Sequence, residues 1–170
     1  MNPRRILLVA SLAVLAFAPT LAAAQGAAAA AADNPDLAEA RNYTLTMDKL
    51  RTLADATDAV NKLLASNAAL KARVDAGSSG NLPLDQQAKK MDADFPQIAA
   101  IIHAHGITTR DYILISIAFM NDVTFVGMKR QGMIQAYPPN SVTPQNAAFV
   151  EANWDKLQAL GQRMTPQNQN

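Results

Sequence analysis

A nearly continuous apolar stretch, residues 112–128, limits more than any other feature what this chain can fold into. The four residues before it, 108–111, fit a helix capping box with aspartate in place of the usual glutamate. A segment running from Thr109 to about Gln131 exceeds the length of ordinary strands. Because apolar residues occur on all of its sides, we expect a central helix buried among others.

Two details of this stretch leave alternatives open. Ile113, Ile115 and Ile117 alternate and are β-branched, which also permits a strand. Asn121 and Asp122 interrupt the apolar pattern, so a kink or a division into two helices is a second alternative. The length and the flanking signals favour a helix over a strand.

Helix signals recur along the rest of the chain. Thr46 is a candidate N-cap for a helix with one apolar face. Ser66 or Asn67 is a candidate N-cap for a short continuation over 68–76. Thr143 is a candidate N-cap for a last helix, which is expected to end at Gly161. Residues 85–92 and a segment that starts at Pro96 are further candidates. The sequence therefore predicts an all-α fold, a single compact domain over residues 43–163 with four to six helices around the central helix 112–128.

The two ends of the chain are expected to lie outside this domain. Residues 1–24 read as a signal peptide, with Arg4 and Arg5 before the apolar run 6–18 and small residues before a cleavage point at Gln25. That run is too short to span a bilayer comfortably. We expect a periplasmic or secreted protein, an alanine-rich disordered leader over 25–42, a frayed tail over 164–170, and no membrane span after cleavage.

Composition excludes several classes of function. Removal of residues 1–24 lowers Lys plus Arg from 15 to 13 while Asp plus Glu stays at 14, a net charge of −1. Such a chain lacks the basic surface that nucleic-acid binding requires. It also has no cysteine, so disulfides, thiolate nucleophiles, cysteine metal sites and a lipid anchor at the cleavage point are excluded.

Three residues are the candidates for a ligand site: His105, Asp122 and Tyr112. Asp122 is the carboxylate we most expect to be buried, although we favour the interpretation that Asn121 or Asp122 caps a second helical piece and is solvated. His105 is expected beside Ile98 at the end of a helix, where it would satisfy terminal carbonyls. No phosphate loop, nucleophile elbow or metal-binding glutamate pair occurs, so we predict no catalytic set and no cofactor.

The leading hypothesis is a non-catalytic protein that binds a small apolar ligand or a protein partner in a groove between helices. One alternative is a haem- or metal-binding bundle with a histidine and a methionine as axial ligands. His103 and His105 would lie about 200° apart on a helix and so would not share one metal. A further alternative is an enzyme that uses Asp122 and His105.

Three segments resemble a family of small secreted helical proteins of Gram-negative bacteria that has no known activity. They are RNYTLTMDKL at 41–50, HGITTRDY at 105–112 and NAAFVEAN at 146–153. The resemblance implies a periplasmic address and assigns no active site.

Overall fold

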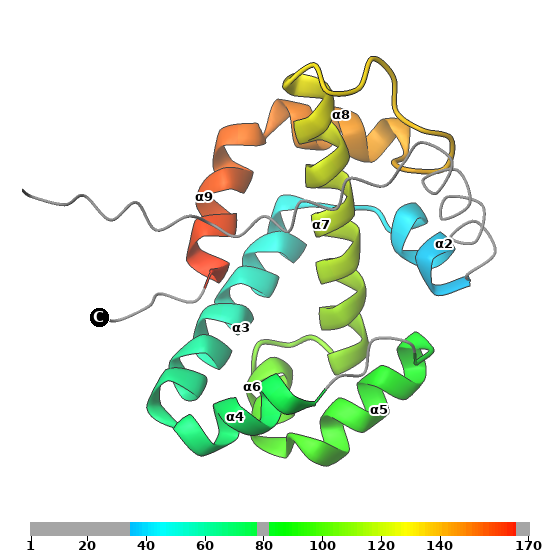
Figure 1. Ribbon diagram of the computed structural model, residues 1–170. Coiled ribbons are helices and arrows are strands. Elements are labelled where there is room, and N and C mark those ends of the chain that lie inside the picture. Colours follow the sequence, from blue (N-terminus) through cyan, green and yellow to red (C-terminus); the bar gives the residue numbers. More distant parts are fainter. Residues whose placement is uncertain (1–34, 78–81, 166–170) are drawn as a thin grey trace, which may run out of the picture.

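The computed structural model describes residues 35–77 and 82–165, and every regular element in these ranges is an α-helix (Figure 1). The elements are α2 (Pro35–Asn42), α3 (Met47–Ser66), α4 (Ala68–Ala76), α5 (Leu84–Asp94), α6 (Pro96–Ala104), α7 (Thr109–Arg130), α8 (Pro144–Ala152) and α9 (Trp154–Met164). The all-α prediction is confirmed. The described part of the chain has eight helices, and seven of them follow residue 43, where four to six were expected.

The apolar stretch forms one unbroken helix, α7, at the centre of the fold (Figure 1). Thr108 is its N-cap, and the Thr108 hydroxyl oxygen accepts a hydrogen bond from the Asp111 backbone N–H at 3.0 Å. Asn121 and Asp122 do not interrupt it, because their side chains reach partners in other segments and leave the helical backbone bonds intact. The strand and the two-helix alternatives are both wrong.

The packing of α7 is that of a core helix. By length and composition it is apolar enough to cross a membrane, but core helices of globular proteins meet the same criteria. It contacts α2, α3, α5, α6 and α8. Buried side chains of α3, α7, α8 and α9 form the largest apolar cluster, and a second cluster joins α3, α4 and α6. These contacts on several sides explain why the helix shows little amphipathic pattern.

The folded part of the chain begins earlier than expected, at α2. Residues 35–42 were predicted to belong to a disordered leader, but Ala40 is buried with Leu84 and Leu114 in a third apolar cluster between α2, α5 and α7. This helix is short and weakly amphipathic, so tertiary contacts rather than its own sequence stabilise it. The predicted signal peptide and the first part of the leader lie outside the described residues, as do residues 166–170 of the predicted tail.

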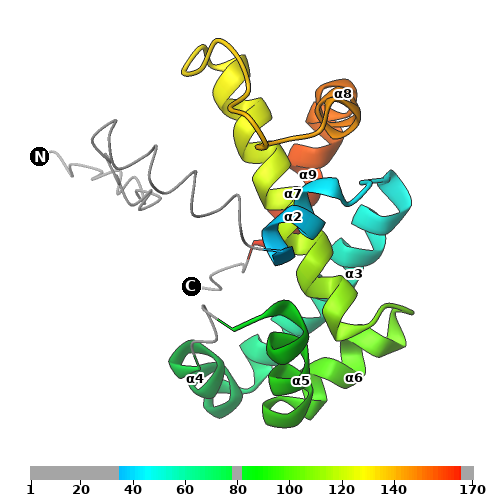
Figure 2. The same ribbon diagram turned by 90° about the vertical axis from the view of Figure 1, so that its right-hand side faces the viewer.

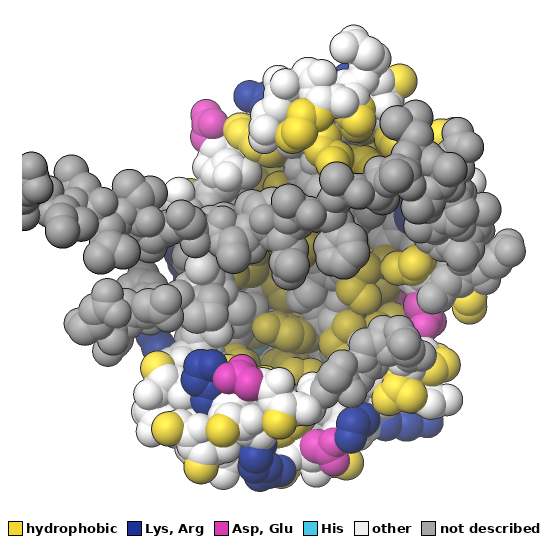
Figure 3. Space-filling view, viewed as in Figure 1, with side chains coloured by type: hydrophobic (Ala, Val, Ile, Leu, Met, Phe, Trp, Pro, Cys, Tyr) yellow, Lys and Arg dark blue, Asp and Glu magenta, His cyan; other side chains and the backbone are white. Residues whose placement is uncertain are grey.

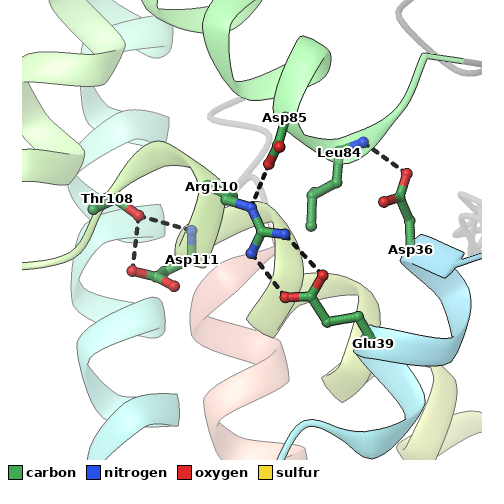
Figure 4. A network of polar contacts seen from close by, with 7 residues as sticks. All are labelled: Asp36, Glu39, Leu84, Asp85, Thr108, Arg110 and Asp111. Atoms are coloured by element: carbon green, nitrogen blue, oxygen red, sulfur yellow. Dashed lines mark hydrogen bonds and ion pairs between the residues drawn. The ribbon is translucent and has the colours of Figure 1, made fainter.

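Arg110 of α7 forms ion pairs with both α2 and α5 (Figure 4). Its guanidinium donates two hydrogen bonds of 2.8 Å to the two carboxylate oxygens of Glu39 and one of 2.5 Å to Asp85. Hydrogen bonding to Arg110 lowers the pKa of both carboxyl groups below their ordinary values. Asp36 adds a fourth contact by accepting the Leu84 backbone N–H at 2.7 Å. These contacts hold α2 against α5 and α7.

The expected last helix is divided into α8 and α9. Thr143 is the N-cap of α8 as predicted, and Pro144 occupies the first turn. The Asn153 side chain donates to the Phe149 carbonyl at 2.9 Å and marks the break between the two helices. Gly161 lies inside α9, which continues to Met164, so the predicted end at this glycine is wrong.

Candidate functional site

Asp122, in the middle of α7, is fully buried, with 0 % of its surface exposed. One carboxylate oxygen accepts a hydrogen bond from the Asn146 side-chain amide at 2.7 Å, and the other accepts from the Asn121 amide at 3.1 Å. The favoured interpretation of this carboxylate as a solvated helix cap is therefore wrong. A continuous α7 has no cap in its interior, and the side chain is instead enclosed by neighbouring segments.

Asn146 connects this carboxylate to the chain before α3. It is the third residue of α8 and 1 % exposed. Besides its bond to Asp122, its amide nitrogen donates to the Tyr43 carbonyl at 2.8 Å, and its oxygen accepts from the Leu45 N–H at 3.2 Å. The Asn121 amide also donates to the Ser141 carbonyl at 2.5 Å. One buried polar junction thus joins α7, α8, residues 43–45 and the loop before α8.

Burial decides the electrostatics of this junction. Desolvation raises the pKa of Asp122 to about 6, well above its ordinary value of 3.8. The N–H donors of Asn121 and Asn146 favour the charged form and limit this rise. No ion pair links Asp122 to a cationic side chain of the described residues, so amide dipoles alone compensate its charge.

A cavity of about 170 Å³ lies beside the junction, between α2, α7 and the loop that leads from α7 to α8. Figure 2 shows α2 lying against α7, with this loop above it. Apolar groups form most of the cavity wall: Leu37, Ala40, Ile117, Phe125, Pro138 and Pro139. Arg41, Asn121, Asn140 and Ser141 supply its polar groups. Because Asn121 also bonds to Asp122, the junction supports one side of the cavity.

Two residues shape the loop over the cavity. Asn140 adopts a positive φ of 60°, a conformation that asparagine tolerates better than most residues. Its carbonyl accepts a hydrogen bond from the Arg41 guanidinium at 2.9 Å, which ties the loop to the last turn of α2. The Ser141 hydroxyl donates to the Pro138 carbonyl at 2.8 Å and closes the turn.

No protein family, curated protein or solved structure matches this chain. The chemistry of the cavity therefore has to be inferred from its own residues.

The three candidate ligand residues do not come together. Tyr112 and Asp122 lie ten residues apart on α7, which corresponds to about 15 Å along the helix axis. His105 is the C-cap of α6 and is exposed, because α6 ends at Ala104, before it can carry His105 onto its apolar face. None of the three lines the cavity.

Two of the alternatives, an enzyme that uses Asp122 with His105 and a metal site built from His, Asp and Glu, find no assembled site in the described part of the chain. His105 precedes the first residue of α7, and Asp122 lies a further 13 residues along, about 20 Å of helix. An acid and a base at that separation do not act on one substrate atom. Within residues 35–77 and 82–165, no three His, Asp or Glu side chains gather as potential metal ligands.

Tyr112 has a structural role between helices. Its hydroxyl lies 3.0 Å from the Thr57 hydroxyl of α3, and burial raises its pKa above the ordinary value. We expect Tyr112→Phe to lower the free energy of unfolding by about 1 kcal/mol, because one partly buried hydrogen bond is lost. Urea denaturation measures this loss. Tyr43→Phe is the control, since Tyr43 packs its ring against the same core and should change stability by less.

The residues that form the cavity were missed by sequence analysis. Leu37 and Arg41 were placed in the predicted leader, and Pro138 and Pro139 were read as an ordinary loop. The pair of prolines is the one local signal, because it predicts a rigid segment beside the central helix. Nothing in the sequence indicates that α2 returns to the same place.

Proposed function

We propose that this chain is an exported, non-catalytic binding protein whose cavity between α2, α7 and the 138–141 segment holds a small apolar ligand. The observation that supports the proposal is the composition of that cavity, which has apolar walls and a few convergent polar groups. Ligand sites generally combine these two features. The predicted signal peptide supports a periplasmic or secreted location.

The size of the cavity sets the size of the ligand. A closed apolar cavity of about 150 Å³ accommodates a molecule such as benzene. At about 170 Å³, this cavity fits a molecule of roughly six to ten non-hydrogen atoms. This is smaller than the usual range for drug-sized ligands, so we expect fragment-sized compounds rather than long lipids or peptides.

A rigid α7 and a tethered loop favour a preformed site. Ile117 and Phe125 project from the central helix, whose opposite side packs in the core. The loop is anchored at Asn140 by Arg41 and at Ser141 by Asn121. Anchoring of this kind reduces the ordering that binding would otherwise require, which favours affinity for a small molecule.

Neutral apolar probes test the proposal directly. We expect toluene or 1-hexanol to bind, and at about ten times the dissociation constant to raise the free energy of unfolding by about 1.4 kcal/mol. For a domain of this size the melting temperature should rise by about 5 °C. Calorimetric titration and thermal unfolding at several probe concentrations measure both quantities.

A matched pair of variants locates the binding. Ile117→Trp places a large ring in the cavity and should abolish the rise in melting temperature. Met120→Trp adds the same ring one turn away on the same helix, where the side chain is 64 % exposed, and should leave binding unchanged. Equal probe binding by the two variants, or no binding by the unmodified protein, would contradict the proposal.

A further inference from the structure

Among the described residues that line the cavity, Arg41 is the only cationic one. It lies in the last turn of α2 and is half-buried. One of its terminal nitrogens donates to the Asn140 carbonyl at 2.9 Å. A guanidinium carries five N–H donors in a planar fork, so most of its hydrogen-bonding capacity remains available beyond this contact.

No carboxylate of the described residues neutralises Arg41. Three other arginines form ion pairs: Arg51 with Asp48, Arg163 with Asp55, and Arg110 with two acids. Arg73 and Arg130 form none among the described residues, but each lies over an aromatic ring, of Phe95 and of Trp154 respectively. Asp122 is hydrogen-bonded to Asn121, another residue of the cavity wall, but its oxygens are occupied by the amides of Asn121 and Asn146. A half-buried guanidinium that has no counter-ion among the described residues and lies next to apolar walls favours the binding of an anionic group from a ligand.

A second cavity provides a contrast within the same molecule. It has a volume of about 210 Å³ and lies between α4, α5, α6 and α7, with Met91, Phe95 and Ile98 in its apolar wall. The cation that lines it, Lys90, forms an ion pair with Asp94, which lines the same cavity. In the described residues the cation and the anion of that cavity therefore satisfy each other.

Apolar surface continues outside these cavities. Figure 3 shows apolar side chains gathered in a hollow over the middle of the face drawn in Figure 1, with charged side chains along its lower edge. We base the inference on the cavity beside α2, whose lining residues are known, and not on this broader surface.

From this juxtaposition of an unpaired guanidinium and apolar walls, we infer that the ligand is a small amphipathic carboxylate of about six to eight carbon atoms. The inference rests on the proposed binding function and specifies its ligand class. The carboxylate binds to Arg41 at the rim, and the hydrocarbon part packs against Leu37, Ile117 and Phe125. The same guanidinium that holds the loop through Asn140 thus also recognises the ligand.

Hexanoate and 1-hexanol form the decisive pair of probes, because they share a six-carbon chain and differ in the charged group. We expect the unmodified protein to bind hexanoate at least tenfold more tightly than 1-hexanol at low salt. Arg41→Gln should weaken hexanoate binding by about 10- to 100-fold, the range for hydrogen bonds to a charged group, while 1-hexanol binding stays within about twofold. Arg41→Lys should retain part of the hexanoate preference. Calorimetric titration supplies all of these constants.

The two probes also distinguish the failure of this inference from the failure of the proposed function. Equal affinity for hexanoate and 1-hexanol, or unchanged hexanoate binding by Arg41→Gln, would overturn the inference and leave an apolar site in place. A loss of both probes in Arg41→Gln would assign Arg41 to holding the loop alone and would also overturn it. No binding of either probe would reject both proposals. Arg51→Gln, on α3 and absent from the cavity wall, is the control for general charge effects.

Discussion

Asn146→Leu is expected to destabilise the protein by about 3 to 5 kcal/mol, because one side chain satisfies two buried polar groups and a partly buried one. Without the amide, the Leu45 N–H, the Tyr43 carbonyl and one oxygen of Asp122 lose their partners. Leucine has a similar volume, so it leaves little room for a water molecule to replace the lost bonds. Small domains have a total stability of about 5 to 15 kcal/mol, so much of the protein should be unfolded in moderate urea.

Urea denaturation monitored by circular dichroism measures this effect. Asn153→Leu is a matched control, because Asn153 is half-buried between α8 and α9 and makes a single side-chain hydrogen bond, to the Phe149 carbonyl. We expect it to cost about 1 kcal/mol. If Asn146→Leu cost no more than this control, the polar junction would not stabilise the fold.

Asp122 should make stability fall as the pH rises through about 6. Its pKa in the folded protein is raised to about 6, and its ordinary value of 3.8 represents the unfolded chain. The folded state therefore binds the proton more tightly, and this stabilisation is fully present below pH 3.8 and lost as the pH rises through 6. A difference of about two pKa units corresponds to about 3 kcal/mol in total, of which about 2 kcal/mol is lost between pH 4 and pH 7.

The measurement is the free energy of unfolding at a series of pH values, for the unmodified protein and for Asp122→Asn. The variant does not titrate at this position, so the difference between the two curves should change by about 2 kcal/mol over this range. Glu39 and Asp85, the two acids bonded to Arg110, have lowered pKa values, so their contribution to the free energy of unfolding falls as the pH becomes acidic. They are present in both proteins, so their contribution cancels. A constant difference from pH 4 to pH 7 would show that Asp122 does not titrate in this way.

Local signals predicted much of the helical framework. Thr46 and Thr143 are N-caps as expected, and Asn67 caps α4 by accepting the Leu70 N–H at 2.9 Å. Gly106 follows α6 with a positive φ of 79°, as a glycine after a helix end predicts. N-caps and helix-ending glycines act through contacts within a few residues of the chain, so they can be predicted from the sequence without knowledge of the fold.

Contacts between segments that are distant in the sequence could not be predicted from it. Ala40 and Leu84 meet across 44 residues, and Asn146 bonds to Tyr43 across 103. The residues around α2 and around Asn146 show no sequence pattern that indicates these partners. Asp122 was interpreted as a solvated helix cap for the same reason. One of the two amides that bind it, that of Asn146, lies 24 residues away in the sequence, so the pattern around Asp122 does not predict its burial.

The sequence by itself determined that this protein is all-helical, where many of its helices begin and end, and that its most apolar segment is the central one. These properties follow from short-range hydrogen bonding and from the total apolar surface of a segment, which are both local quantities. Only the tertiary structure decided that α2 folds back onto α7, that Asp122 is enclosed by amides, and that Arg41 meets the prolines at a cavity. Those arrangements depend on which surfaces pack together, and packing is a property of the whole chain.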